Sequence, residues 1–273
     1  MCGKQANDTM KQEMMSGNEI MQRRFLIDYL KNEDEKLRSI EIPAEDAAQR
    51  QLLRSLMNIR PAYPVSKDFI SVQDSYLKNE LAKKGVVRLS ELSAVKPGVY
   101  LWQGDITRLS VDAIVNAANH AMLGCFIPCH ACIDNAIHSA AGVQLRLECS
   151  RMMEKQGGPE PAGKAKITNG YNLPCRYVLH TVGPVIYGDV TEKDCGLLAD
   201  CYLSCLELAA EHCLKSVAFC CISTGEFHFP NQTAAEIAIQ TVKDYQKKNQ
   251  NGMEVVFNVF KDCDYEIYKQ LLE

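Results

Sequence analysis

The amino-acid sequence predicts an α/β domain with a mixed or parallel sheet covered by helices on both faces, preceded by a helical N-terminal segment. The chain of 273 residues is long enough for one large domain, or for one domain with an extension. Before residue 91 apolar residues recur at helical spacing. From about residue 91 short β-rich runs alternate with helical runs, as is typical of such a sheet. We therefore expect a helical extension over residues 1–90 and the main domain over residues 91–273.

The N-terminal segment contains three predicted helices. Apolar residues share one face over 18–30 and over 43–59, and the segment Arg60–Pro64 (RPAYP) ends the second helix. A third helix fits 72–84 and stops at Gly85. This segment carries no obvious chemistry, so we interpret it as a helical cap on the main domain.

The main domain should place its chemistry in loops that follow strands, because ligands of such sheets bind outside the carboxyl ends of the strands. Predicted strands cover 99–103, 112–118, 164–170, 176–182, 216–222 and 254–260. Predicted helices cover roughly 132–156, 193–214, 231–248 and 263–272.

Composition excludes several classes of protein. A net charge of -4 gives no reason to expect a nucleic-acid partner, although backbone amides can hold a nucleotide-like ligand without basic side chains. The longest apolar runs, such as 216–223, are far short of the ~20 residues of a membrane helix. Residues 1–15 lack the apolar stretch of a secretory signal. We expect a cytoplasmic protein that binds neither nucleic acid nor membrane.

The thirteen cysteines argue against a disulfide framework, because their number is odd and no signal peptide is evident. Most stand singly in apolar surroundings and are expected to be core residues, as free cysteines commonly are. Examples are Cys201, Cys205, Cys220 and Cys221.

One cysteine-rich loop stands apart, between Gly124 and Asp134. Cys125, His130 and Cys132 form the pattern Cys-x4-His-x-Cys, a ligand set that suits zinc. Three ligands leave a fourth position open, as in catalytic zinc sites. Cys129 is a less suitable ligand because it neighbours His130. The alternative is that these cysteines are simply buried and hold no metal.

Two other motifs resemble parts of this loop and fail. A zinc deaminase requires His-x-Glu upstream of Pro-Cys-x-x-Cys, and His120-Ala121-Met122 lacks the glutamate. Haem attachment requires a histidine after the second cysteine, where this chain has Ile133.

Three further loops follow predicted strands. Asp105 in Gly104–Thr107 suits an acceptor for an exocyclic amine, or it caps a local turn. Asn116 and Asn119 offer the donors and acceptors that a ribose diol requires, or they form an Asx turn. The segment 222–227 (ISTGEF) presents successive backbone N–H groups, an arrangement that binds phosphate without Lys or Arg.

Five spaced segments in this order resemble the macrodomain family. They are GDIT (104–107), VNAAN (115–119), IDNAIHSAAG (133–142), LHTVGP (179–184) and ISTGEF (222–227). The resemblance covers about residues 91–273 and implies a three-layer α/β/α fold with a mixed sheet that binds ADP-ribose.

The family pattern also implies roles for single residues. By this pattern Asp105 bonds the adenine amine, Ile106 contacts adenine through its backbone, and Asn119 lies near the distal ribose. The residues implied to wrap the diphosphate and distal ribose are Ser223, Thr224, Gly225, Glu226 and Phe227.

The loop before the Ile-Asp helix departs from the common family pattern. Common hydrolytic macrodomains have a glycine run there, whereas this chain has GCFIPCHAC (124–132). This resembles the zinc-containing branch of macrodomains, which has helical N-terminal extensions. That branch removes ADP-ribose from acidic side chains, in microbes often with a sirtuin-like transferase that modifies a lipoyl carrier protein.

The sequence thus implies a zinc-dependent protein-ADP-ribose hydrolase. Asn119 and Asp134 are the candidate catalytic residues, with Asp134 placed to orient water or a metal-bound group, or else only to favour the start of its helix. Three alternatives remain open: a reader that binds ADP-ribose without chemistry, a hydrolase of free acyl-ADP-ribose, and a structural zinc protein.

Overall fold

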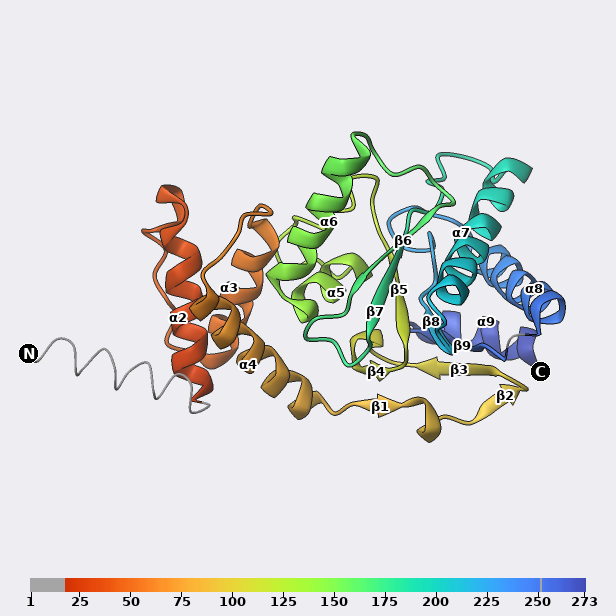
Figure 1. The fold of residues 1–273 in the computed structure, drawn as a ribbon, viewed down its shortest axis with the longest axis horizontal. Helices are drawn as coiled ribbons and strands as arrows, with labels where there is room; N and C mark the ends of the chain where they lie inside the picture. Colours follow the sequence, from red (N-terminus) through yellow and green to blue (C-terminus); the bar gives the residue numbers. More distant parts are fainter. Residues whose placement is uncertain (1–17, 251) are drawn as a thin grey trace, which may run out of the picture.

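A seven-stranded mixed sheet forms the centre of the molecule in the computed structural model, which describes residues 18–250 and 252–273 (Figure 1). The strand order is β2-β3-β9-β8-β5-β7-β6. In that order the strands span Ala94–Lys96, Val99–Gln103, Glu254–Val259, Ser216–Phe219, Ala113–Ala117, Tyr177–Thr181 and Ala165–Asn169. The five central strands run parallel, and the edge strands β2 and β6 pair antiparallel. The predicted mixed sheet is therefore confirmed.

Helices cover both faces of the sheet and complete three layers. One face carries α5 (Ile133–Ala141) and α6 (Val143–Gln156), which follow β5. The chain then crosses the sheet in the opposite direction, which places α7, α8 and α9 on the other face (Figure 1). These three helices span Glu192–Glu211, Asn231–Asn249 and Asp262–Leu272. The core between the layers includes the buried Cys201, Cys205 and Cys220, while Cys221 is half-buried.

The sequence predicted one helix over 132–156, and the structure divides it at Gly142. This residue has φ 98°, a left-handed conformation that favours glycine. A Cβ atom there would lie 2.5 Å from Nε2 of Gln73 in the N-terminal segment. The Gln73 carboxamide oxygen accepts a hydrogen bond from the Val143 N–H, at 3.0 Å. The break therefore lets the backbone meet the extension closely.

Several short elements were not predicted. Strand β1 (Val87–Arg88) pairs with β4 (Leu109–Ser110) outside the main sheet. Short 3-10 helices lie at Glu35–Leu37, Leu89–Glu91 and Ile106–Arg108. Strands and turns of two or three residues carry too few positions for a periodic pattern to reveal them.

The N-terminal segment folds as three helices with an apolar core of their own. They are α2 (Glu19–Asn32), α3 (Asp46–Ile59) and α4 (Lys67–Lys84), and they pack beside α5 and α6 (Figure 1). Helix α4 begins five residues before the predicted start because the Ser66 side chain caps it, accepting a hydrogen bond from the Phe69 N–H. Expectations for residues 1–17 lie outside the described residues, and the domain boundary near residue 90 stays a prediction.

Among the helices of the described ranges, none is both long enough and apolar enough to cross a lipid bilayer.

Candidate active site and metal centre

A cleft of about 1080 Å³ opens at the carboxyl ends of β3, β5 and β8, where the fold places ligands. One wall comes from the extension and includes Leu53, Tyr76 and Leu81. The cleft is also lined by the residues expected from the sequence to be catalytic, to bind the metal, or to contact adenine, diphosphate and distal ribose, with the exception of Asn116: Asp105, Ile106, Asn119, Cys125, His130, Cys132, Asp134 and Ser223 to Phe227.

The three predicted metal ligands converge on one side of this cleft. Their ligating atoms all lie within 4.8 Å of one another, and the Cys125 Sγ and His130 Nδ1 atoms are 3.7 Å apart. Zinc bonds of about 2.3 Å to sulfur and 2.0–2.1 Å to nitrogen span separations of this size. Cys129 points elsewhere, with its Sγ atom 3.2 Å from the Ser55 hydroxyl. Two thiols and one imidazole therefore fit a zinc ion that keeps an open position.

Cys132 also caps the N-terminus of α5. Its Sγ atom accepts a hydrogen bond from the Asn135 N–H at 3.4 Å. Burial raises the pKa of the Cys132 thiol well above its usual range, and the bond from Asn135 opposes this rise only in part. A coordinated thiol is deprotonated outright, so a bound cation would reverse this shift.

His130 joins the metal loop to the loop that follows β8. The Nδ1 atom of its ring faces Cys125, and the second ring nitrogen, Nε2, lies 3.7 Å from a carboxylate oxygen of Glu226. A carboxylate beside the second ring nitrogen is a common partner for a metal-binding histidine, because it fixes the tautomer. The Glu226 side chain is 70% exposed, which makes the interaction weak.

Asp134 lies at the base of the cleft in a network of amides. Its two carboxylate oxygens accept hydrogen bonds from Asn116 at 2.8 Å and from Asn119 at 3.3 Å. Asn119 also donates to the Gly124 carbonyl and accepts from the Ala121 N–H. Asn119 therefore connects the candidate acid to the start of the metal loop, and it also forms the Asx turn that the sequence left as an alternative.

Burial controls the acidity of Asp134. Loss of solvent raises the pKa of the Asp134 carboxyl to about 6, against the lowering effect of the Asn116 hydrogen bond and of the Arg146 charge. His138 Nε2 lies 3.5 Å from one carboxylate oxygen, and burial lowers the pKa of this imidazole well below its usual value. The carboxyl thus has a pKa near neutral pH, where it can exchange a proton.

Asp105 follows β3 and has two contacts. One oxygen accepts from the backbone and hydroxyl of Thr107, which is the local cap that the sequence allowed. The other oxygen lies 3.5 Å from the Lys84 ammonium group of the extension. Because Asp105 and Lys84 both line the cleft, this carboxylate remains partly available to a ligand.

The loop after β8 presents backbone donors to the cleft. The N–H groups of 224–227 have no acceptor among the described residues. Ser223 adopts φ 64°, and its hydroxyl is buried against Gly183. The Thr224 hydroxyl donates to the Cys221 carbonyl. The backbone amides of this loop, and not its hydroxyls, are thus the groups that can hold an anion.

Sequence reasoning gave one residue, Asn116, the wrong role and overlooked one wall of the cleft. Asn116 is fully buried and holds Asp134, so it does not offer its carboxamide to a ligand as expected. The cleft wall formed by α3 and α4 was also missed. The available signal was the polar face of α3, which contains Arg54, Ser55 and Asn58 beside the apolar residues of that helix.

Comparison with known proteins identifies the family to which this fold belongs. A family model for the macro domain matches residues 115–238. A protein-ADP-ribose hydrolase of Treponema medium is 54% identical over 252 residues, which cover 91% of this chain and 97% of that protein. One of Staphylococcus aureus (strain MSSA476) is 53% identical over 222 residues, which cover 81% of this chain and 83% of that protein.

A solved structure extends the comparison to three dimensions. The Trypanosoma brucei macrodomain in complex with ADP-ribose aligns with a TM-score of 0.64 and 29% identity, over 80% of this chain and 95% of that one. The chain therefore belongs to the macrodomain family. It is an enzyme of the hydrolase class.

Proposed function

We propose that this protein is a zinc-dependent hydrolase that removes mono-ADP-ribose from acidic side chains of modified proteins. The observation that carries the proposal is the convergence of Cys125, His130 and Cys132 on the cleft that also contains Asn119 and Asp134. A reader module would need no such ligand set with an open position.

The groups that line the cleft can be assigned to the parts of ADP-ribose. Asp105 is the acceptor for the adenine amine, and the free amides of 224–227 hold the diphosphate. Asn119 and the metal loop then flank the distal ribose, whose anomeric carbon carries the ester to the target protein. The similarity to relatives that are protein-ADP-ribose hydrolases supports this assignment.

Hydrolysis adds water across the bond between the ribosyl group and the carboxylate of the target. The products are the free carboxylate, ADP-ribose and a proton. Asp134, with a pKa of about 6, accepts that proton from the attacking water above pH 6. Asn119 holds the carboxylate of Asp134 toward the cleft. When bound, zinc supplies Lewis acidity toward an oxygen at the sugar.

The test replaces His130 with alanine and measures zinc content together with release of ADP-ribose from a protein modified on glutamate or aspartate. The variant should lose zinc and most of its activity. Full activity without zinc would contradict the proposed role. Cys129→Ala is the matched control, because Cys129 lies in the same loop but outside the ligand group.

Substrate choice is tested by comparing three substrates with the wild-type enzyme: a protein modified on acidic residues, the same protein modified on arginine, and a free acylated ADP-ribose. The acidic-linked protein should react fastest. The resemblance to the zinc-containing branch makes an ADP-ribosylated lipoyl carrier protein the first target to test. Equal rates on the free ester would contradict the preference for modified proteins.

A further inference from the structure

Helix α3 of the extension contacts the metal loop through one polar face. Gln51, Arg54, Ser55 and Asn58 are three or four positions apart, so they share one side of the helix. The loop 124–132 contains no helix or strand of its own. Within it one backbone hydrogen bond joins the His130 N–H to the Ile127 carbonyl, so most of its support comes from contacts with other elements.

Two side chains of α3 bind the backbone of this loop directly beside metal ligands. Asn58 accepts a hydrogen bond from the Cys129 N–H at 2.9 Å. Cys129 has φ 53°, a strained conformation for a residue with a side chain. Arg54 donates to the His130 carbonyl at 3.0 Å. One residue next to a ligand and one ligand itself are thus fixed by α3.

Arg54 also acts through α5. Its guanidinium donates to the Asn135 carboxamide oxygen at 2.7 Å, and Asn135 donates in turn to the Ile127 carbonyl at 2.9 Å. The Asn135 N–H binds the Cys132 sulfur. A single guanidinium therefore connects α3 to the backbone at His130, to the middle of the loop and to Asn135, whose N–H donates to the Cys132 sulfur.

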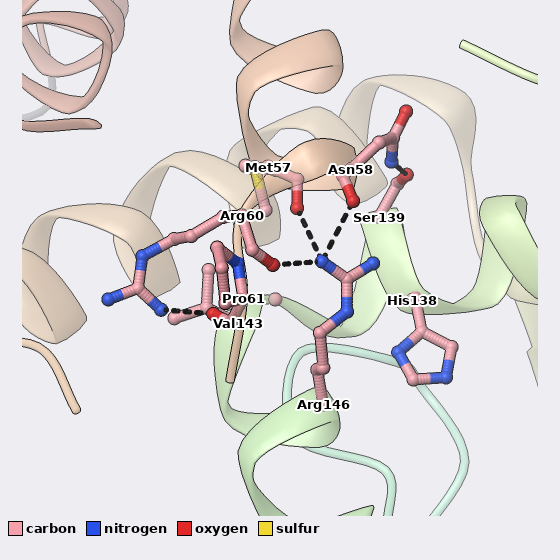
Figure 2. A pocket seen from close by; sticks show the side chains of 9 residues that line it. Met57, Asn58, Arg60, Pro61, His138, Ser139, Val143 and Arg146 are labelled. Atoms are coloured by element: carbon pink, nitrogen blue, oxygen red, sulfur yellow. Dashed lines mark hydrogen bonds between the residues drawn. The ribbon is translucent and has the colours of Figure 1, made fainter. Parts of the chain in front are cut away.

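The start of the loop is held to the end of α3 by Arg146 of α6. Figure 2 shows its guanidinium donating to the carbonyls of Met57 and Asn58 in the last turn of α3 and of Arg60, which follows the helix. Its Nε atom donates to the Leu123 carbonyl at 2.6 Å, and its guanidinium lies 4.2 Å from the centre of the Phe126 ring. Burial lowers the pKa of Arg146 to about 10, so it keeps its charge at neutral pH.

We propose that the N-terminal extension is part of the metal centre, and that Arg54 and Asn58 are positioning residues that hold the loop in the geometry that binds zinc. This inference rests on the proposed function, because it requires that Cys125, His130 and Cys132 bind the metal. It gives the extension a role beyond covering the main domain. Groups that orient metal ligands typically change metal affinity by about 10- to 100-fold when removed.

The experiment measures zinc affinity by competition with a chromophoric chelator, on the full chain and its variants Arg54→Ala and Asn58→Ala. Each should bind zinc about 10-fold or more weakly than the wild type. Arg54→Lys, which can still donate to one carbonyl, should recover part of the loss. Gln51→Ala is the matched control, because its exposed side chain is removed while its backbone carbonyl stays.

Two further readouts separate positioning from general damage. Cobalt in place of zinc should show altered thiolate-to-metal and d–d absorption bands in both alanine variants. The ADP-ribose hydrolase rate of both variants should recover when zinc is added in excess. The thermal unfolding of the metal-free proteins identifies a variant that fails to fold. If Arg54→Ala fails, Asn58→Ala and Arg54→Lys decide the question; if Asn58→Ala fails, the two Arg54 variants decide it.

Wild-type zinc affinity and cobalt spectrum in folded Arg54→Ala and Asn58→Ala would overturn the inference and leave the proposed function intact. A wild-type chain that binds no zinc would overturn both. A rate that stays low in excess zinc, with zinc bound normally, would also overturn the positioning role.

Discussion

Replacing Gly183 with alanine tests whether the loop after β8 binds the diphosphate. A Cβ atom at Gly183 would lie 2.0 Å from the Ser223 hydroxyl and 2.9 Å from Cγ2 of Ile222. Rotation of the Ser223 hydroxyl alone does not clear the site, because Cβ of Ser223 would still lie 3.3 Å from the new atom and Cγ2 of Ile222 only 2.9 Å away. Inserting a methyl group into such a contact costs about 1–3 kcal/mol. If the loop moves to relieve it, ADP-ribose affinity should fall between about 5-fold and 150-fold.

Calorimetric titration with ADP-ribose measures this change, and thermal unfolding shows whether the variant is folded. Gly188→Ala is the matched control, because no heavy atom lies within 4 Å of a Cβ there. It should bind as the wild type does. A folded Gly183→Ala variant with unchanged affinity would refute the placement of the diphosphate on this loop.

Three further predictions concern titratable groups in the cleft and in the core behind it. Asp134→Asn should lower kcat by about 10²- to 10⁴-fold while zinc and ADP-ribose still bind, and a wild-type rate would exclude Asp134 as the proton acceptor. Glu226→Ala should weaken zinc binding by at most about 5-fold, because this carboxylate is exposed; complete loss of zinc would make it a ligand. Burial lowers the pKa of His180 to about 3, so the unfolded chain takes up a proton below pH 6.5 that the folded chain does not. Stability should therefore be full above pH 6.5 and fall by about 1.4 kcal/mol per pH unit toward pH 3 from this group. The raised pKa of Asp134 opposes this fall below about pH 6, so the test uses the Asp134→Asn variant after chelator treatment; equal unfolding free energies of that variant at pH 7 and pH 5 would contradict the prediction.

The sequence was sufficient to predict the fold because its signals are local and repeated. Alternating β-rich and helical runs predicted the sheet and its covering helices within a few residues at most boundaries. The break at Gly142 was missed because its cause is a contact with Gln73, about 70 positions away in the chain. A helical pattern on both sides of a glycine carries no record of such a distant partner.

The site could be predicted in part for a related reason. The spacing of Cys125, His130 and Cys132 within one loop fixed their proximity in advance. The role of Asn116 was not predictable, because side chains alternate between the two faces of a strand and both faces of β5 are covered, so the sequence does not say whether Asn116 faces the cleft or Asp134. The contribution of Arg54 was hidden because it depends on how the extension packs against the domain.

The most direct measurement of the central claim follows zinc content and the rate of ADP-ribose release on one preparation during stepwise chelation and re-addition of zinc. The rate should fall in proportion to the zinc removed and return with it, up to one zinc per chain. A rate that stays constant while the zinc content falls to zero would contradict the claim that the Cys125, His130 and Cys132 centre takes part in the reaction.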